Sequence, residues 1–309
     1  MKLLSRVVWS EGMHLSQHHF QLQSRYFEDA TEFAVASLLR APWGLLACEM
    51  DAEALLNGTV ALRRARGVMP DGLPFQFPED PPPEPVEIGE AFSPTRSEHR
   101  IMLWVAAYAP DKANTADGEG TGASTRYLPW PRTVVDENTG REETELILAR
   151  KNFALCLDHQ VPEDAVAMPV ARVRRDGSGR FVYDGAYIPP SLRIGASEGL
   201  LTLLRRLVEM LDQKAGALMA ERQAAYTSTA EYAGNEVAGF WLSHAVHSGL
   251  AALQHHLQLR AAHPEALFLE LSRLAGALCT FSLDAHPREL PSYDHEDLEG
   301  CFTALEAHV

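Results

Sequence analysis

Histidine is the residue type most able to do chemistry in this sequence, because it occurs 13 times in 309 residues. His14 and His18 have the i, i+4 spacing with which one face of a helix can chelate zinc, and His19 adjoins them. The zincin signature also requires a glutamate directly after the first histidine, and Leu15 stands there instead. We therefore expect no metal at this cluster.

Two further histidine pairs lie in the C-terminal part of the chain. His244 and His247 are spaced i, i+3, and the adjacent His255 and His256 point to different faces of a helix. Neither pair has a cysteine or carboxylate partner at a known ligand spacing. The sequence predicts no metal and no cofactor, and we interpret the histidines as polar edge residues or as residues satisfied by backbone groups.

Carboxylates near the C-terminus offer the other possible chemistry. Asp284 and His286 lie close in sequence, as do Asp294 and His295, but no Gly-x-Ser-x-Gly nucleophile elbow accompanies them. Asp294 is interpreted as a helix N-cap followed by an acidic first turn. Cys279 lies in an apolar string, where a thiol is a poor nucleophile. We predict that the chain is not an enzyme, and the alternative is a metal-dependent hydrolase that uses the histidines and the Asp294 region.

Charge and composition exclude several classes of partner. The formal net charge is −15, and residues 1–190 (27 acidic, 19 basic) and 191–309 (15 acidic, 8 basic) are both acidic. An acidic surface repels phosphate backbones, so we expect no nucleic-acid partner. No run of about eighteen apolar residues is present, so no direct membrane insertion is expected. The N-terminus does not have the pattern of a secretory signal, which favours a cytoplasmic protein with reduced cysteines.

The secondary structure that must position these residues is predicted to change from strands to helices near residue 190. Before it, short apolar runs alternate with turn residues, and no helical pattern separates them, which indicates an antiparallel sandwich or barrel. Asn57–Gly58 is expected to form a hairpin turn, and Pro70–Gly72 a second turn. The stretch 111–125, rich in Gly, Ala, Thr and Asp, is expected to be a mobile loop. The predicted strands cover roughly residues 43–50, 60–65, 66–69, 74–77, 101–108, 145–149, 153–157, 168–173 and 181–183.

After Pro190 the apolar spacing becomes helical. The first expected helix follows Ser197, a plausible N-cap, and later helices cover about 230–260, 265–281 and 294–309. Four helices with short connections form a bundle. The first helix carries a heptad-type seam, with spacings of four, three, four and seven, made of Leu200, Leu204, Leu207, Leu211 and Leu218. The predicted fold class is therefore α+β and multidomain, with an antiparallel β-sandwich followed by an α-helical bundle.

The first thirty residues carry the remaining pattern. Large apolar residues are spaced through a polar stretch, rich in glutamine and histidine, which cannot form a core of its own. Such a segment packs on its own domain or on a partner, and the sequence leaves both possibilities open. The candidate partner-binding residues are Trp9, Gly12, Met13, Leu15, Phe20, Tyr26 and Phe27.

Residues throughout the chain resemble the TssK family, the baseplate subunit of the type VI secretion system. The matching residues occur in the family's order and are Trp9, Gly12–Met13, Leu15, Phe20–Gln21, Pro42–Gly44, Leu192–Ile194, His263–Glu265, Leu271, Leu274–Gly276, Leu278, Phe281 and Leu290–His295. Each residue alone is weak, and together they are specific. Ser16 and Ser292 depart from the family, which has proline at both places.

The resemblance implies an N-terminal docking segment (1–30), a β-sandwich shoulder similar to phage receptor-binding proteins (31–190) and a helical neck (191–309). It implies a homotrimer, which would be packed by Leu200, Leu204, Leu207, Leu211, Leu218 and Trp241. It also implies an adaptor that joins the baseplate proteins TssF and TssG to the inner-membrane complex of TssJ, TssL and TssM. TssL and TssM would be contacted mainly through a C-terminal head domain, which we expect to be absent here. A phage-type receptor-binding or tail adhesin protein is the alternative.

Overall fold

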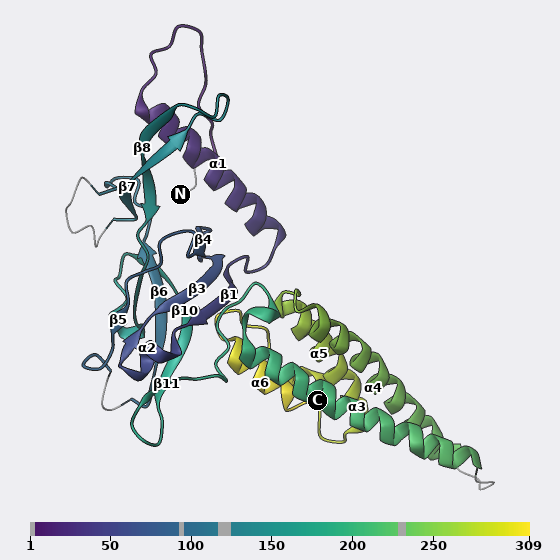
Figure 1. Cartoon of the computed structure of the whole chain (residues 1–309). Helices are drawn as coiled ribbons and strands as arrows, with labels where there is room; N and C mark the ends of the chain where they lie inside the picture. Colours follow the sequence, from purple (N-terminus) through teal and green to yellow (C-terminus); the bar gives the residue numbers. More distant parts are fainter. Residues whose placement is uncertain (1–3, 93–95, 117–124, 228–232) are drawn as a thin grey trace.

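The chain folds into a strand-rich shoulder and an elongated helical neck (Figure 1). The computed structural model describes residues 4–92, 96–116, 125–227 and 233–309. Strands dominate residues 44–183 and helices residues 198–306, which confirms the predicted α+β multidomain class, whereas the helix over residues 17–38 was not predicted. Residues 117–124 of the expected mobile loop lie outside the described residues. The expected boundary at residue 30 falls inside the first helix, α1 (Gln17–Leu38).

Two antiparallel sheets form the shoulder, with strand orders β1–β3–β4 and β11–β10–β6–β9. Their inner faces share one core, in which Leu45 and Phe75 from the first sheet pack with Leu103 and Met168 from the second. Alternate side chains of a strand point to the same face, as in β6, where Ile101, Leu103 and Val105 enter this core. The strands are β1 (Gly44–Met50), β3 (Leu62–Val68), β4 (Pro74–Phe77), β6 (Glu98–Ala106), β9 (Ala154–Leu157), β10 (Ala165–Arg175) and β11 (Phe181–Tyr183).

Two short ribbons complete the shoulder, and the sequence analysis missed one strand of the larger ribbon. The smaller pairs β2 (Thr59–Val60) with β5 (Val86–Glu87), and the larger pairs β7 (Tyr127–Val135) with β8 (Glu143–Lys151). Pro129 and Pro131 argue against a strand, because proline cannot donate a ladder hydrogen bond. β8 is the only described strand that pairs with β7, and on the other edge of β7 an isolated bridge joins Tyr127 to Thr115, so that both prolines lie along the part of this edge beyond the bridge.

One predicted turn is confirmed and the other is wrong. Pro70–Gly72 connects β3 to β4, with Gly72 at φ +88°. Asn57 and Gly58 instead close the short helix α2 (Ala52–Leu56), since their amides donate to the carbonyls of Ala54 and Leu55 at 3.0 and 2.8 Å. Gly58 has φ +80°, so the pair provides the left-handed C-terminal residue of a helix and not a hairpin turn.

In the described part of the neck there are four α-helices, α3 (Glu198–Thr227), α4 (Ala233–Leu259), α5 (Pro264–Leu278) and α6 (Leu298–Glu306). Ser197 accepts a hydrogen bond from the amide of Leu200 at 3.3 Å, as expected of an N-cap. The expected cap of the last helix is wrong by three residues. Asp297 caps α6 by accepting from the amide of Gly300 at 3.0 Å, whereas Asp294 binds the amide of Glu296 in the preceding turn.

The leucine seam of α3 has a different role from the one predicted. Leu200, Leu204, Leu207, Leu211 and Leu218 are all buried within a single chain, in one core with apolar residues of α4, α5 and α6. Heptad spacing specifies an apolar face without specifying which helix covers it. The assignment of these leucines to trimer packing is therefore wrong. Trp241 on α4 is 56% exposed and remains available for contact with another chain.

The shoulder and the neck are joined by backbone as well as by side chains. Leu45 in β1 donates its amide to the carbonyl of Pro190 at 2.9 Å and accepts from the amide of Leu192 at 2.8 Å. Gly44 lies against this linker with φ +120°, and a Cβ atom there would lie 2.8 Å from the backbone of Pro190. His295, which precedes α6, approaches the Trp43 carbonyl with Nε2 at 2.9 Å. The first shoulder strand is thus anchored to two separate parts of the neck.

Candidate functional site

The N-terminal segment folds back onto the start of α1. Gly12 has φ +76° in a turn that is closed by a 3.3 Å hydrogen bond from the Met13 amide to the Ser10 carbonyl. Ser16 begins α1, and its amide donates to Nδ1 of His19 at 3.1 Å. The ring of Trp9 lies 6.0 Å from that of His19 and 6.2 Å from that of Phe20. The turn therefore places Trp9 over the first turn of α1.

Polar side chains attach α1 to the shoulder. The guanidinium of Arg25 lies 3.5 Å from the ring centre of Tyr108 and forms an ion pair with Glu28 at 3.1 Å. Asp29 is buried, and Glu32 packs on Gly72 in the β3–β4 turn. A helix on the surface of a domain usually buries its apolar stripe and exposes its polar face. In α1 the polar residues make the contact, and large apolar residues face outward.

Four of the predicted partner-binding residues form what we call the docking surface: Trp9, Leu15, Phe20 and Phe27, with exposed fractions of 50, 53, 56 and 58%. Gly12 forms the turn, and Met13 and Tyr26 are half-buried. Of the two possibilities that the sequence left open, the polar face of α1 docks on its own shoulder while the docking surface stays uncovered. The sequence analysis missed its continuation, in which Phe33 and Leu38 at the end of α1 are also exposed.

The expected histidine pairs do not form metal sites among the described residues. His14 precedes α1, so the i, i+4 spacing to His18 is not a helical one. His247 Nδ1 lies 2.7 Å from the carbonyl of Ser243, one turn earlier in α4, and the His255 and His256 rings are 6.1 Å apart. His247 thus contacts the backbone, and His14, His18 and His255 are exposed.

The carboxylate and histidine residues near the C-terminus serve the junction between shoulder and neck. His263 caps α5 by accepting from the amide of Glu265 at 3.2 Å, and its ring stacks on that of His295, with centroids 5.3 Å apart. Nδ1 of His295 lies 2.8 Å from the Tyr293 hydroxyl, and its Nε2 lies at the Trp43 carbonyl, as in a neutral imidazole. Burial lowers the pKa of both histidines. They are structural groups whose burial favours the neutral ring.

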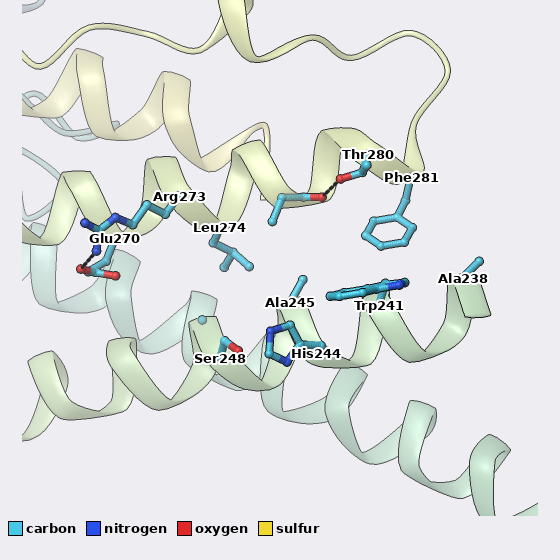
Figure 2. Close-up of a pocket in the computed structure, with 12 residues that line it drawn as sticks. Ala238, Trp241, His244, Ala245, Ser248, Glu270, Arg273, Leu274, Thr280 and Phe281 are labelled. Carbon is cyan, nitrogen blue, oxygen red and sulfur yellow. Dashed lines mark hydrogen bonds and ion pairs between the residues drawn. The ribbon is translucent and has the colours of Figure 1, made fainter. Parts of the chain in front are cut away.

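Trp241 lines a groove on the neck (Figure 2). It has a volume of about 520 Å³ and lies between α4 and α5, where small side chains such as Ala238 and Ala245 leave room for a partner. Trp241 contacts the ring of Phe240 at 5.9 Å and that of His244 at 5.8 Å. The exposed residues Val237, Phe240 and Trp241 are called the neck surface below.

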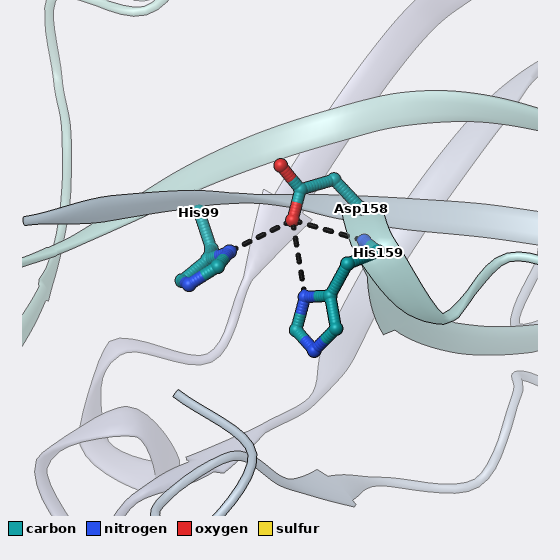
Figure 3. A group of neighbouring side chains, drawn as sticks. All are labelled: His99, Asp158 and His159. Carbon is teal, nitrogen blue, oxygen red and sulfur yellow. Dashed lines mark hydrogen bonds and ion pairs between the residues drawn. The ribbon is translucent and has the colours of Figure 1, made fainter. Parts of the chain in front are cut away.

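One cluster with metal-ligating groups was missed by the sequence analysis (Figure 3). His99 on β6 and Asp158 on the short helix η1 (Asp158–Gln160) lie 59 residues apart, and His159 follows Asp158. Nδ1 of His99 is 2.8 Å from Asp158 Oδ1, and Nδ1 of His159 is 3.5 Å from the same oxygen. Burial acts to raise the pKa of Asp158, but hydrogen bonds from His99 and His159 and the charge of Arg96 hold it below its ordinary value. Because His99 and Asp158 are 59 residues apart, no local spacing in the sequence predicts that they meet.

The family of the chain follows from comparison with known proteins. A family described as "Bacterial Type VI secretion, VC_A0110, EvfL, ImpJ, VasE" matches residues 19–309. The type VI secretion system baseplate component TssK1 of Pseudomonas aeruginosa is 33% identical over 306 residues, which cover 97% of this chain and 67% of that protein. The chain belongs to the TssK family. This confirms the resemblance inferred from the sequence.

Solved TssK structures share the whole described fold. A crystal structure of TssK superposes with a TM-score of 0.88 at 28% identity, covering 98% of this chain and 68% of that one. A chain of a TssK–TssF–TssG baseplate subcomplex superposes with a TM-score of 0.86 at 28% identity, covering 99% of this chain and 97% of that one. TssK is a structural component of the type VI baseplate, and this chain is therefore a baseplate protein.

Among the described helices, none has both the length and the hydropathy needed to span a bilayer.

Proposed function

We propose that this chain is an adaptor that binds TssF and TssG through its docking surface. The observation that supports this most is the inverted orientation of α1, which contacts its own shoulder through Arg25 and Glu32 and exposes Phe20 and Phe27. Exposed aromatic residues on a rigid helix are typical anchors of protein–protein interfaces. The relative in the TssK–TssF–TssG subcomplex supports TssF and TssG as the partners.

Copurification with TssF and TssG of the same secretion system tests this proposal. The variant Trp9→Ala, Leu15→Ala, Phe20→Ala removes three anchors whose side chains are half exposed, so the core of the shoulder stays intact. A matched control, Gln17→Ala, Gln21→Ala, Ser24→Ala, changes three exposed polar residues of the same helix. The wild type and the control should copurify with TssF and TssG, and the anchor variant should not. If the anchor variant has an unchanged circular dichroism spectrum and binds as well as the control, the docking surface is not the interface.

The second part of the proposal is a homotrimer held by the neck surface. The leucine seam is already covered by helices of its own chain, so another copy must use residues that remain exposed. Phe240 and Trp241 are large, adjacent and more than half exposed, and the groove beside them has the size of a small binding site. An apolar patch with these features is typical of a contact between subunits.

We propose that a different part of the TssK architecture makes the connection to the membrane. This chain aligns with 67% of the length of its Pseudomonas relative. We propose that the remaining part of that architecture makes the main contact with TssL and TssM of the TssJ–TssL–TssM complex. We also propose that the protein lies in the cytoplasm beside the inner membrane. Loss of the docking surface should accordingly abolish binding of TssF and TssG and leave binding of TssL and TssM unchanged. Comparison of both pull-downs in one experiment tests this division.

A further inference from the structure

We propose that His99, Asp158 and His159 bind one Zn²⁺ ion at the edge of the shoulder sheet. The three ligand atoms converge, because Nδ1 of both histidines faces the same oxygen of Asp158 (Figure 3). All three atoms lie within 4.8 Å of one another. This site is independent of the docking surface and of the neck surface.

The sheet explains why residues so distant in sequence meet. β6 and β9 are antiparallel neighbours, and Ile101 pairs with Leu157. His99 precedes Ile101 by two residues and lies on the same face of its strand, and η1 begins directly after Leu157. The start of one strand is therefore level with the helical turn that ends the other. Phe92 packs edge-on against the His99 ring, with centroids 4.7 Å apart, and fixes its orientation.

The ligand set matches zinc better than magnesium or calcium. Zinc takes imidazole nitrogen and carboxylate oxygen at about 2.0–2.2 Å in a tetrahedral arrangement, and three protein ligands leave a fourth position for water. Magnesium and calcium prefer sites made entirely of oxygen. Ligand atoms of a tetrahedral zinc lie roughly 3.4 Å apart, so the 3.5 Å separation of His159 and Asp158 already fits. The 2.8 Å separation of His99 and Asp158 must widen, because the ion replaces the proton that the two groups share.

Burial and charge around the cluster allow this change. The His99 side chain is 1% exposed and cannot rotate freely, whereas that of His159 is 44% exposed and can adjust to the ion. The guanidinium of Arg96 lies 3.6 Å from Oδ2 of Asp158, the oxygen that faces away from both histidines. Arg96 is largely exposed, so its charge can move away when the ion enters. Zinc would then tie the β9–β10 connection to the start of β6.

Titration of the whole 309-residue protein with ZnCl₂, after treatment with a chelator, tests the site. We expect one Zn²⁺ per chain by isothermal titration calorimetry, with a rise in the thermal midpoint on binding and no comparable binding of MgCl₂. Asp158→Asn and His159→Ala each remove a ligand without changing a buried ring. Each should weaken binding by at least about tenfold, the smallest loss usual for changes at metal sites. His255→Ala removes an exposed histidine of the neck and should bind zinc as the wild type does.

A second readout separates this site from other histidines at the surface. Co²⁺ in place of Zn²⁺ should give the intense visible absorption of a tetrahedral site in the wild type and in His255→Ala, and not in His159→Ala. The proposal is overturned if the wild type binds no stoichiometric zinc. It is equally overturned if His159→Ala and Asp158→Asn bind zinc as tightly as the wild type, because the three residues would then be only a hydrogen-bonded cluster.

Discussion

Arg172 in the shoulder and Glu299 in the neck form an ion pair, with Nη2 of the arginine 2.8 Å from Oε1 of the glutamate. The same guanidinium contacts Asp184 at 2.6 Å, so one cation connects two acids from different parts of the chain. All three side chains are largely buried. The orientation of the neck relative to the shoulder therefore depends in part on Arg172.

Removal of the carboxylate should weaken the protein measurably. Glu299→Ala takes away one charge-assisted hydrogen bond, and the expected loss in the free energy of unfolding is about 1–2 kcal/mol. Glu53→Ala is the control, because its ion pair with Arg63, at 3.9 Å, is exposed on the shoulder and should cost less than about 0.5 kcal/mol. Urea unfolding of both variants provides the comparison. Equal losses would show that the Arg172 pair has no special role at the junction.

Gly44 is predicted to tolerate no side chain. Its φ of +120° is unfavourable for alanine, and a Cβ atom would lie 2.8 Å from Pro190. Gly44→Ala should lower the free energy of unfolding by about 2–3 kcal/mol, through backbone strain and through this contact. Gly58 also has positive φ, at +80°, but no atom lies within 4 Å of its added Cβ, so Gly58→Ala should cost only about 1 kcal/mol. If the two variants lose the same free energy, the close approach to Pro190 is unimportant.

The stacked pair His263 and His295 predicts a loss of stability in mild acid. Burial lowers the pKa of both groups in the folded protein, so the folded state resists protonation while the unfolded state takes up protons below its pKa of about 6.5. The stability that depends on the neutral rings is complete above that pH and falls as the pH decreases. His263→Asn keeps an N-cap oxygen for α5 and removes one titrating ring, so its stability should fall less between pH 7.5 and pH 5.5.

Thermal unfolding at both pH values measures this effect. His255→Asn, at an exposed position of α4, should retain the pH dependence of the wild type. An equal decrease in the midpoint for the wild type and for His263→Asn would contradict a role of the stacked pair.

The neck surface predicts that oligomerisation depends on aromatic residues and not on the leucine seam. Light scattering of the wild type should give about three times the chain mass of 34.1 kDa. Trp241→Ser should reduce the mass toward that of one chain, because it replaces an exposed aromatic residue at the edge of the groove. Leu56→Ser changes an equally exposed leucine on the shoulder and should leave the mass unchanged. A monomeric wild type, or a Trp241→Ser protein of unchanged mass, would rule out this interface.

Local sequence patterns predicted most strands before residue 190 and the helices after it, because each element has its own period and its own boundary residues, but they missed α1. The turn at Pro70–Gly72 and the cap at Ser197 are set by neighbouring backbone atoms, and both are as expected. The hairpin prediction at Asn57–Gly58 was wrong because a residue with positive φ can end a helix as readily as it forms a hairpin turn. β7 was missed because it contains two prolines, which are rare inside strands.

The candidate sites were less accessible from the sequence than the elements. Heptad spacing showed that α3 has an apolar face, but helices of the same chain cover that face, which no local pattern can indicate. The approach of His99 to Asp158 depends on the pairing of β6 with β9 and has no signal in the sequence. The docking surface could be proposed from the sequence because its residues lie close together, although which face of α1 contacts the shoulder required the structure.

The affinity of the protein for a purified TssF–TssG complex is the most direct measure of the adaptor proposal. Trp9→Ala removes the aromatic ring that lies over the first turn of α1, and a central anchor of this kind contributes about 2 kcal/mol or more. The dissociation constant should therefore rise roughly thirtyfold for Trp9→Ala and remain within about twofold of the wild type for Gln21→Ala, an exposed polar neighbour of Phe20. Equal dissociation constants for the wild type and Trp9→Ala would contradict the assignment of the docking surface to TssF and TssG.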